Sequence, residues 1–300
     1  MRGPGAPSAT ATRAAFRERL ASDGIVVAPG AFNPLSAMLI ERRGFESVYV
    51  SGAMLAAELG LPDVGLTTAS EVAQRSGQIA RVTALPVVVD ADTGFGGPVN
   101  VARSVALLED AGVAALHLED QVNPKRCGHL DGKAVVERPE ALQRIRAAVD
   151  ARRDPNLLII ARSDARAVEG LDATLDRLRA YVDAGADAVF PEALADAGEF
   201  AAARAAIDVP ILANMTEFGR GESLRVDQLD ALGVDLVIFP VSLLRLAMGA
   251  ADRALAALRA DGDLSSVIDS MQTREQLYDL LDYASYASFD DSIATFRPSS

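Results

Sequence analysis

One pattern repeats along almost the whole of this 300-residue sequence: a short apolar run rich in β-branched residues, a polar loop, and then a helical stretch. Such alternation predicts βαβ units, in which the strands are parallel. Eight repeats predict an α/β protein with a closed (β/α)8 barrel of the TIM type, and a doubly wound open sheet is the alternative. The predicted strands cover residues 25–28, 47–51, 86–90, 115–119, 157–162, 188–191, 210–214 and 236–240. The clearest predicted helices cover residues 10–21, 99–111, 139–152, 171–184 and 195–206.

Several of the predicted helices end in a glycine that fits a left-handed helix cap. AGVAALHLE, AGADAVFPE and LGVDLVIFP each place this glycine just before an apolar strand. No low-complexity or linker-like tract interrupts the series, so we expect one barrel over residues 10–250. Residues 1–9 are predicted to be a disordered lead. Residues 251–300 are predicted to form a C-terminal helical segment that packs on the barrel or on a neighbouring subunit.

Composition narrows the expected partners and location. The formal net charge is −13 and no basic block occurs, which argues against binding to nucleic acid. A single cysteine excludes an internal disulfide and fits a reducing, cytoplasmic compartment. No secretory leader pattern and no apolar run of the ~20 residues needed to span a bilayer occurs, so no membrane association is expected. A polyanionic substrate would need a local cationic pocket in this acidic chain.

Most of the predicted strands end in polar residues. In a barrel the carboxyl ends of the strands meet at one mouth, where barrel enzymes carry their chemistry. We therefore expect a functional mouth, although solvated loop starts would also be polar. The residues in question are Ser51 and Gly52, Asp90 and Asp92, Glu119 and Asp120, Arg162 and Asp164, Glu192, and Asn214.

Residues 115–129, ALHLEDQVNPKRCGH, combine the only cysteine, Cys127, with both histidines of the chain. Lys125, Arg126 and His129 are close to Cys127 in sequence, and positive neighbours favour a thiolate. Cys127 is therefore a candidate for proton exchange near neutral pH. The alternative is an inert cysteine in a surface loop.

The segment VVVDADTGFGG places Asp90 and Asp92 two residues apart, so both carboxylates would point the same way if the strand extended that far. Two hard oxygen ligands, together with water and substrate oxygens, suit Mg²⁺, which is seldom held by protein ligands alone. The alternative is that one aspartate caps a turn and the other is solvated. The glycines of this segment do not match a dinucleotide-binding fingerprint.

Three arginines are placed where they could reach the mouth and grip a carboxylate with two hydrogen bonds. Arg162 ends a predicted strand, Arg245 follows the last strand, and Arg274 lies in MQTREQLY. For Arg245 and Arg274 the alternative is a salt-bridged position on the surface.

Seven motifs follow one another along the chain: SGAMLAAELGLPDVGL, VDADTGFGG, LHLEDQVNPKRCGH, ARSDARAVEGLDA, FPEA, ILANMTEFG and MQTREQLY. Together they resemble the 2-methylisocitrate lyases of the isocitrate lyase and phosphoenolpyruvate mutase superfamily, in family order, and the resemblance runs from about Phe16 to about Tyr286. The KRCGH loop is similar to that of the lyase branch, and the mutase and phosphonopyruvate hydrolase branches lack it. The chain also lacks the extra segments of the longer isocitrate lyases.

The resemblance implies a fold, an activity and an assembly. The fold is a barrel in which the helix after the eighth strand is swapped between subunits of a homotetramer. The activity is cleavage of the tricarboxylate 2-methylisocitrate to pyruvate and succinate, in the methylcitrate route of propionate catabolism. The cofactor is Mg²⁺, with Mn²⁺ as a substitute.

By motif position, the resemblance also assigns site residues. Asp90 and Asp92 match the Mg²⁺ site, with Glu119 and Asp63 acting through water. The substrate-binding turn matches Ser51, Gly52 and Ala53. The rest of the substrate pocket matches Cys127, Gly128, Arg162, Glu192, Asn214, Met215, Thr216, Arg245 and Arg274.

The implied chemistry needs a base for the substrate hydroxyl, Mg²⁺ as Lewis acid, and an acid for the departing carbanion. Asp63 or Tyr49 is the candidate base. Cys127 would protonate the succinate carbanion, with His129 and Glu192 helping to set its protonation state.

Two positions depart from the family pattern, and three other functions compete. Ala53 stands where many members have a second glycine, which leaves the main-chain contacts of this turn open, and Met215 stands where others have isoleucine. An isocitrate lyase and an oxaloacetate decarboxylase of the same superfamily are the nearest alternatives, and the intact KRCGH loop disfavours the second. A ligand-binding barrel without catalysis is disfavoured because Asp90, Asp92 and Cys127 are all present.

Overall fold

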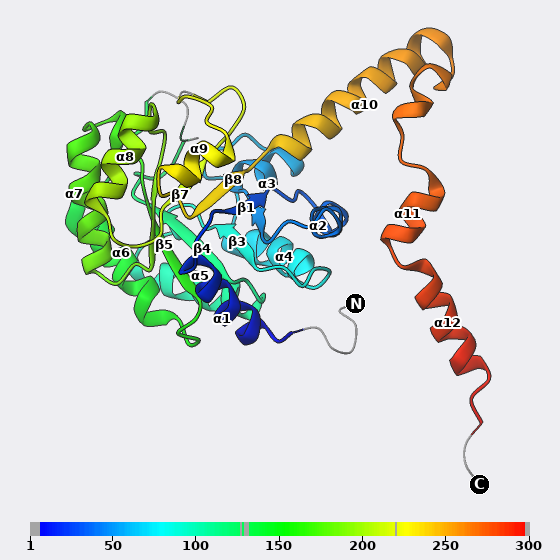
Figure 1. The fold of residues 1–300 in the computed structure, drawn as a ribbon, viewed down its shortest axis with the longest axis horizontal. Helices are drawn as coiled ribbons and strands as arrows, with labels where there is room; N and C mark the ends of the chain where they lie inside the picture. The colour runs from blue at the N-terminus through cyan, green and yellow to red at the C-terminus, as the bar shows by residue number, and fades with distance from the viewer. Residues whose placement is uncertain (1–6, 127, 129–131, 220, 298–300) are drawn as a thin grey trace. The chain divides into compact units, whose positions relative to one another are not determined.

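The computed structural model describes residues 7–126, 128, 132–219 and 221–297. The chain divides into two compact units, Met1–Leu244 and Arg245–Ser300. The division falls earlier in the chain than the predicted boundary at residue 250. Figure 1 shows the helices and strands of each unit.

The first unit is built on eight parallel strands. They are β1 (Val26–Pro29), β2 (Val48–Val50), β3 (Val87–Asp90), β4 (Ala115–Glu119), β5 (Leu158–Ser163), β6 (Ala188–Pro191), β7 (Leu212–Asn214) and β8 (Leu236–Phe239). Strands β2 to β6 pair in sequence order, and β8 pairs with both β1 and β7. Single bridges, Gly30 to Tyr49 and Val189 to Ile211, join these two groups. The ring is therefore closed, so the predicted (β/α)8 barrel is confirmed and the open sheet is wrong.

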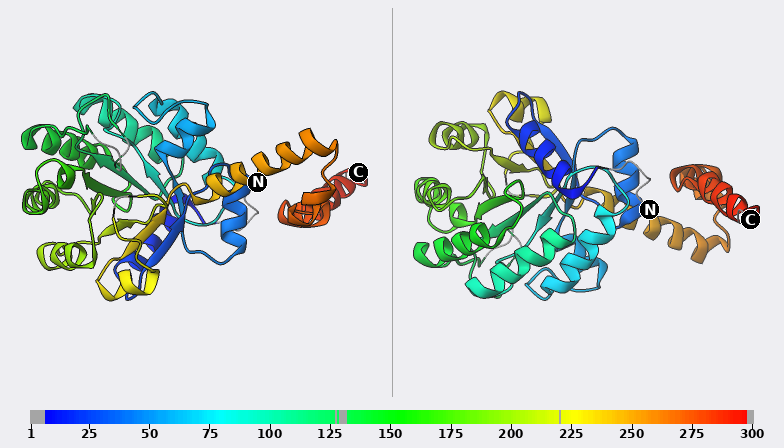
Figure 2. Two further views of the ribbon diagram at one scale, coloured as in Figure 1. Left: turned by 90° about the horizontal axis from the view of Figure 1, so that it is seen from above. Right: turned by 90° about the horizontal axis from the view of Figure 1, so that it is seen from below.

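Helices surround the strands of this unit (Figure 2). They are α1 (Ala9–Leu20), α2 (Pro34–Arg42), α3 (Gly52–Glu58), α4 (Ala69–Ala80), α5 (Pro98–Asp110), α6 (Arg138–Ala151), α7 (Leu171–Asp183), α8 (Ala197–Ala206) and α9 (Val226–Ala231). Each helix named from the sequence is present, with ends shifted by at most two residues. Gly112, Gly185 and Gly233 follow α5, α7 and α9 with φ of 87°, 106° and 75°, as predicted for left-handed caps.

Alternating side chains of each strand divide the apolar core into two layers. Val48, Val87 and Ile159 belong to the layer between strands and helices. Tyr49 and Phe190 belong to a second cluster inside the barrel. Phe16 and Leu20 of α1 join this inner cluster, so α1 covers one end of the barrel.

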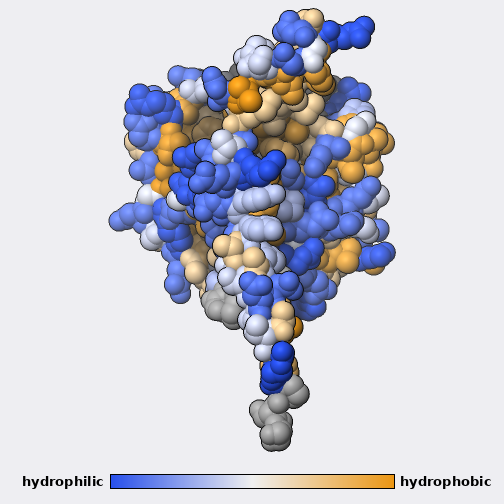
Figure 3. Space-filling model, turned by 90° about the vertical axis from the view of Figure 1, so that its right-hand side faces the viewer, coloured by the Kyte–Doolittle hydropathy of each residue, from blue (hydrophilic) through white to orange (hydrophobic). Residues whose placement is uncertain are grey.

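The second unit is helical. It holds most of α10 (Ser242–Asp261), a 3-10 turn (Ser265–Ser270), α11 (Arg274–Leu280) and α12 (Tyr283–Ala294). Large apolar side chains are exposed along it, among them Leu246 at 69 %, Leu255 at 64 % and Phe289 at 67 %. Hydrophobic residues are also visible among hydrophilic ones on the face drawn in Figure 3. Among the helices of the described residues, none has the length and apolar content to cross a membrane.

Candidate active site

The turn from β2 into α3 places the main chain against two carboxylates. Ser51 caps α3, because its Oγ accepts a hydrogen bond from the N–H of Met54 at 3.3 Å. The N–H of Gly52 donates to Asp90 Oδ2 at 3.2 Å. A Cβ on Gly52 would lie 3.0 Å from Asp90 Oδ2 and 3.1 Å from Asp92 Oδ1, so a glycine is needed for this approach. Ala53 follows in the same turn and is half-buried.

Asp90 and Asp92 converge, although not by strand alternation. Strand β3 ends at Asp90, so the strand does not reach Asp92. The chain instead turns: Asp92 adopts φ 46° and its N–H donates to Asp90 Oδ1 at 3.0 Å. Aspartate tolerates this left-handed conformation better than most residues. Both side chains are buried, so neither is the solvated aspartate of the alternative interpretation.

Lys125 lies between Asp92 and Asp63. Its Nζ contacts Asp92 Oδ1 at 2.8 Å and also donates to Asp63 Oδ1. Burial and the charge of Asp90 raise the pKa of Asp92 to about 6. Burial also opposes ionisation of Asp90, but its electrostatic interactions with His117, Lys125 and Arg162 outweigh burial and lower the Asp90 pKa. The site therefore gathers several carboxylates around one ammonium.

The same carboxylates fit a hard divalent cation. Glu119 Oε1 is a buried oxygen that accepts no hydrogen bond within the described part of the chain, and Asp92 Oδ1 is buried with the Lys125 ammonium as its contact. No set of three or more His, Cys, Asp or Glu side chains forms a cage among the described residues. Mg²⁺ commonly uses one or two carboxylates and completes its shell with water and substrate. The carboxylates of this site match that mode of coordination.

Arg162 lies beside three carboxylates at the ends of β4, β5 and β6. Its Nε is 2.9 Å from Asp164 Oδ2 and 3.2 Å from Glu119 Oε2, and its Nη1 is 3.7 Å from Glu192 Oε2. Its guanidinium also stacks 5.0 Å from the centre of the Phe190 ring. Burial raises the pKa of Glu119 well above its usual range. The predicted residues Arg162, Glu119 and Glu192 are thus brought together.

Tyr49 and His117 lie directly beneath the carboxylates, inside the barrel. Tyr49 OH is 2.8 Å from His117 Nε2, and His117 Nδ1 is 3.7 Å from Asp90 Oδ1. Burial, with the charge of Asp90, raises the pKa of Tyr49 well above 10. Burial lowers the pKa of His117 to about 4. At neutral pH both rings are therefore uncharged.

Gly128 packs onto Arg162 and its three carboxylates, Glu119, Asp164 and Glu192, which are called the arginine cluster from here on. A Cβ at this position would lie 2.5 Å from Arg162 Nη2 and 2.6 Å from Glu192 Oε1. Cys127 and His129, the two predicted residues on either side of it, lie outside the described residues.

The remaining predicted residues divide between the two units. Asn214 ends β7 and its Nδ2 donates to Glu192 Oε1 at 3.4 Å. The Met215 side chain packs in the layer between strands and helices, and Thr216 follows in the next loop. Arg245 in α10 and Arg274 at the start of α11 belong to the second unit.

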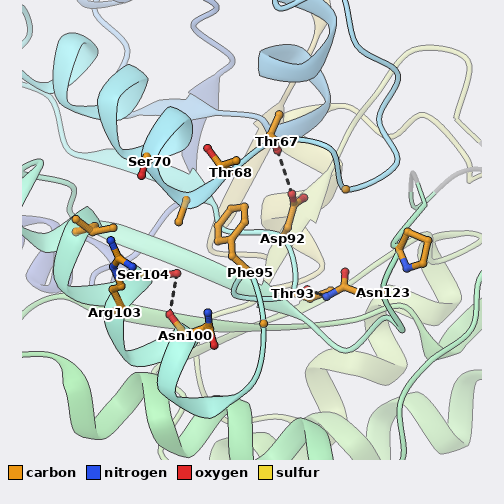
Figure 4. A pocket seen from close by; sticks show the side chains of 15 residues that line it. Thr67, Thr68, Ser70, Asp92, Thr93, Phe95, Asn100, Arg103, Ser104 and Asn123 are labelled. Carbon is orange, nitrogen blue, oxygen red and sulfur yellow. Dashed lines mark hydrogen bonds between the residues drawn. The ribbon is translucent and has the colours of Figure 1, made fainter.

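A cavity of about 590 Å³ opens beside Asp92, between α4 and α5. Figure 4 shows Phe95 and Asp92 facing it, with Asp92 Oδ2 accepting a hydrogen bond from Thr67 Oγ1 at 3.4 Å. Among the predicted site residues, Asp92 alone lines it. The cavity therefore borders Asp92 but neither Asp90 nor Arg162.

Sequence analysis missed several residues that hold the site. Asp164 is predicted only as a polar strand end, yet it accepts two hydrogen bonds from Arg162. Lys125 is predicted only as a neighbour of Cys127, and Lys133 and Gln121 are not among the predicted residues. The one sequence signal of the two lysines is their rarity, since Lys125 and Lys133 are the only lysines of the chain.

The fold and this cluster define a class: a (β/α)8-barrel enzyme with a carboxylate-rich and arginine-containing site at the carboxyl ends of its strands. Residues 16–259 match the model of the phosphoenolpyruvate phosphomutase family. The chain therefore belongs to this family, in the isocitrate lyase and phosphoenolpyruvate mutase superfamily, and the resemblance seen in its motifs is confirmed.

Individual relatives narrow the class. A Corynebacterium glutamicum protein named "Probable 2-methylisocitrate lyase 1" is 57 % identical over 286 residues, covering 95 % of this chain and 94 % of that protein. The 2-methylisocitrate lyase of Salmonella typhimurium is 46 % identical, covering 93 % and 95 % of the two chains. These relatives make the protein a carbon–carbon lyase.

Two solved structures share the fold. Oxaloacetate acetylhydrolase with 3,3-difluorooxalacetate has a TM-score of 0.91 and 35 % identity, covering 97 % of this chain and 100 % of that one. Phosphonopyruvate hydrolase with oxalate and Mg²⁺ has a TM-score of 0.85 and 29 % identity, covering 93 % and 98 %.

Proposed function

We propose that this lyase cleaves 2-methylisocitrate to pyruvate and succinate in a Mg²⁺-dependent reaction, as a step of propionate catabolism through the methylcitrate cycle. One observation supports this most: Asp90 and Asp92 converge on the Gly52 main chain beside a buried arginine. A hydroxy-tricarboxylate has one end for a metal and another for a guanidinium. The names of the relatives supply the identity of the tricarboxylate.

Asp90 and Asp92 would hold the metal, with Glu119 and Asp63 reaching it through water. The bound ion would act as a Lewis acid toward the hydroxyl and carboxylate of the substrate. Lys125 supplies a fixed positive charge next to Asp92 and so limits the repulsion between the carboxylates before the metal arrives. The Mg²⁺ of the phosphonopyruvate hydrolase structure supports this choice of ion.

Arg162 would bind a substrate carboxylate, with Arg245 and Arg274 as further cations. Glu192 and Asn214 are joined by a hydrogen bond and lie next to Arg162, so they would orient the same end of the substrate. The Gly52 turn, with Ser51 and Ala53, would face the half that becomes pyruvate.

Cys127 would serve as the general acid that protonates the succinate carbanion, assisted by His129 and Glu192. For the base, Asp63 is the better candidate. It contacts Lys125 beside the metal carboxylates and is partly accessible. Tyr49 is a poor base, because its phenol is buried and its pKa is raised.

The exposed leucines of α10 support a further proposal about assembly. An amphipathic helix with unburied apolar residues is stabilised by packing on another chain. We propose that α10 packs on a neighbouring subunit in a helix-swapped homotetramer. The single cysteine supports location in the cytoplasm.

The test is a cleavage assay with 2-methylisocitrate and with isocitrate, with and without Mg²⁺. The two substrates differ by one methyl group, which is worth roughly 10–200-fold in discrimination. We expect kcat/KM to favour 2-methylisocitrate by at least about tenfold. Equal or better kcat/KM with isocitrate would make the protein an isocitrate lyase. Absence of both activities would contradict the proposal as a whole.

A further inference from the structure

The chain uses lysine at only two positions, Lys125 and Lys133, whereas the rest of its Lys and Arg side chains are arginines. Both lysines lie in the segment of residues 121–136, which contains Cys127. Their side chains are only 5 % and 2 % exposed. Lysine is seldom buried unless it is paired, so each needs an explanation.

Lys133 bridges the loop and the barrel. Its Nζ donates to Asp164 Oδ1 at 2.9 Å and to the main-chain oxygen of Gly128. The ammonium of Lys133 thus joins a carboxylate of the barrel to a main-chain carbonyl of the loop. The bridge therefore fixes the main-chain carbonyl of Gly128, the residue that follows Cys127.

Asp164 is a rigid anchor for this bridge. It is fully buried, and its other contacts are with Arg162 Nε and Nη2. Its N–H donates to Asp120 Oδ1 at 2.9 Å, and Asp120 also accepts hydrogen bonds from Ser163 and Tyr181. The chain of contacts thus runs from the barrel wall through Asp164 to the loop.

Gln121 fixes the loop on the other side of Cys127. Its Oε1 accepts the N–H of Arg126 at 2.9 Å, and its Nε2 donates to the oxygen of Arg126 at 2.8 Å. An antiparallel bridge between Gln121 and Val135 closes the base of the loop. The main chain is therefore held at Arg126 and at Gly128, the two neighbours of Cys127.

We propose that Lys133 and Gln121 are positioning residues that fix the main chain on both sides of Cys127. Neither residue contacts the carboxylates Asp90 and Asp92. Their effect should therefore appear in the proton transfer assigned to Cys127 and not in metal binding. The inference rests on the proposed function of the thiol.

The test measures kcat, KM, Mg²⁺ affinity by calorimetry and melting temperature for Lys133→Met. Misplacing a reacting group by about 1 Å costs about 10²-fold in rate, so we expect kcat to fall by about that factor. KM should change by less than about threefold, because the variant leaves intact the contacts that bind substrate equally in the ground state and in the transition state. Gln121→Glu loses the N–H that donates to the main-chain oxygen of Arg126. It should likewise lower kcat while KM changes little.

A double variant separates positioning of the thiol from other effects. If Lys133 acts through Cys127, then adding Lys133→Met to the Cys127→Ser variant should lower kcat by a further factor of less than about three. The proposal would be overturned if the kcat losses of the two single variants multiplied in the double variant. Wild-type kcat for Lys133→Met alone would also overturn it. A joint loss of Mg²⁺ affinity and melting temperature would show a merely structural role and would also overturn it.

Two controls complete the design. Arg146→Met removes the cation of an exposed ion pair with Asp150 and should leave every measurement unchanged. Cys127→Ser alone tests the proposed function: full turnover in that variant would refute the thiol as acid. A slow Cys127→Ser enzyme combined with a fast Lys133→Met enzyme would overturn the positioning role alone.

Discussion

Gly128 lies so close to Arg162 that a single methyl group would collide with the guanidinium: a Cβ on Gly128 would be 2.5 Å from Nη2. The same Cβ would be 2.6 Å from Glu192 Oε1. Arg162 cannot easily move away, because Asp164 and Glu119 both pair with its Nε. The loop that contains Cys127 thus approaches the arginine cluster through a residue that has no side chain.

Gly128→Ala should therefore impair the enzyme strongly. We expect kcat/KM to fall by about 10²-fold, because the collision displaces either the loop or Arg162. Steady-state kinetics checks this. Gly97→Ala is the matched control, since Gly97 has φ −75° and a Cβ there meets no atom within 4 Å. Near-normal activity of Gly128→Ala would mean that the loop does not need this close approach.

Cys127→Ser tests the general acid. A serine hydroxyl is a far weaker acid than a thiol, and loss of a general acid costs about 10²–10⁴-fold. We expect kcat to fall within that range while KM changes little. Alkylation of the wild type gives an independent check, because the chain has one cysteine and modification is unambiguous. An alkylated enzyme that keeps full activity would refute the role.

Metal binding should depend on pH through Asp92. A metal needs the deprotonated carboxylate, and the pKa of Asp92 is raised to about 6. Affinity for Mg²⁺ should therefore be about fourfold weaker at pH 5.5 than at pH 7.5. Calorimetric titration measures it. EDTA should abolish activity and Mg²⁺ should restore it, and Asp92→Asn should bind Mg²⁺ poorly at both pH values. Full activity without metal would contradict the proposal.

His117 should make the fold sensitive to mild acid. The pKa of His117 is lowered to about 4 by burial, whereas in the unfolded chain it has its ordinary value of about 6.5. Between these values the unfolded state binds more protons, so stability decreases as pH falls from 6.5 toward 4. For this residue the loss between pH 7.5 and pH 5 is about 2 kcal/mol.

Urea unfolding of the wild type and of His117→Gln at these two pH values isolates that contribution. The raised pKa of Asp92 increases the free energy of unfolding as pH falls over part of the range. Asp92 is present in both proteins, so its effect largely cancels in the comparison. The glutamine variant should lose less stability on acidification than the wild type. The same pH dependence in both proteins would show that His117 does not carry it.

The sequence determined the fold and the chemical character of the site. Eight β-branched runs alternating with helices leave few arrangements other than a closed barrel, because parallel strands need a helical crossover at every step. The polar residues at the strand ends could be collected from sequence for the same reason: the carboxyl ends meet at one mouth. The family motifs then identified the lyase relationship.

Only the tertiary structure decided how these residues contact one another. Asp92 reaches the side of Asp90 through a left-handed turn, which strand alternation does not predict. Arg162 shares Asp164 with Lys133 because a loop separated from β5 in sequence folds back onto its end. Such contacts depend on packing between segments remote in the chain, so spacing alone gives no signal for them. Burial, which shifts the pKa values of Asp92, His117 and Tyr49, is likewise a property of the assembled barrel.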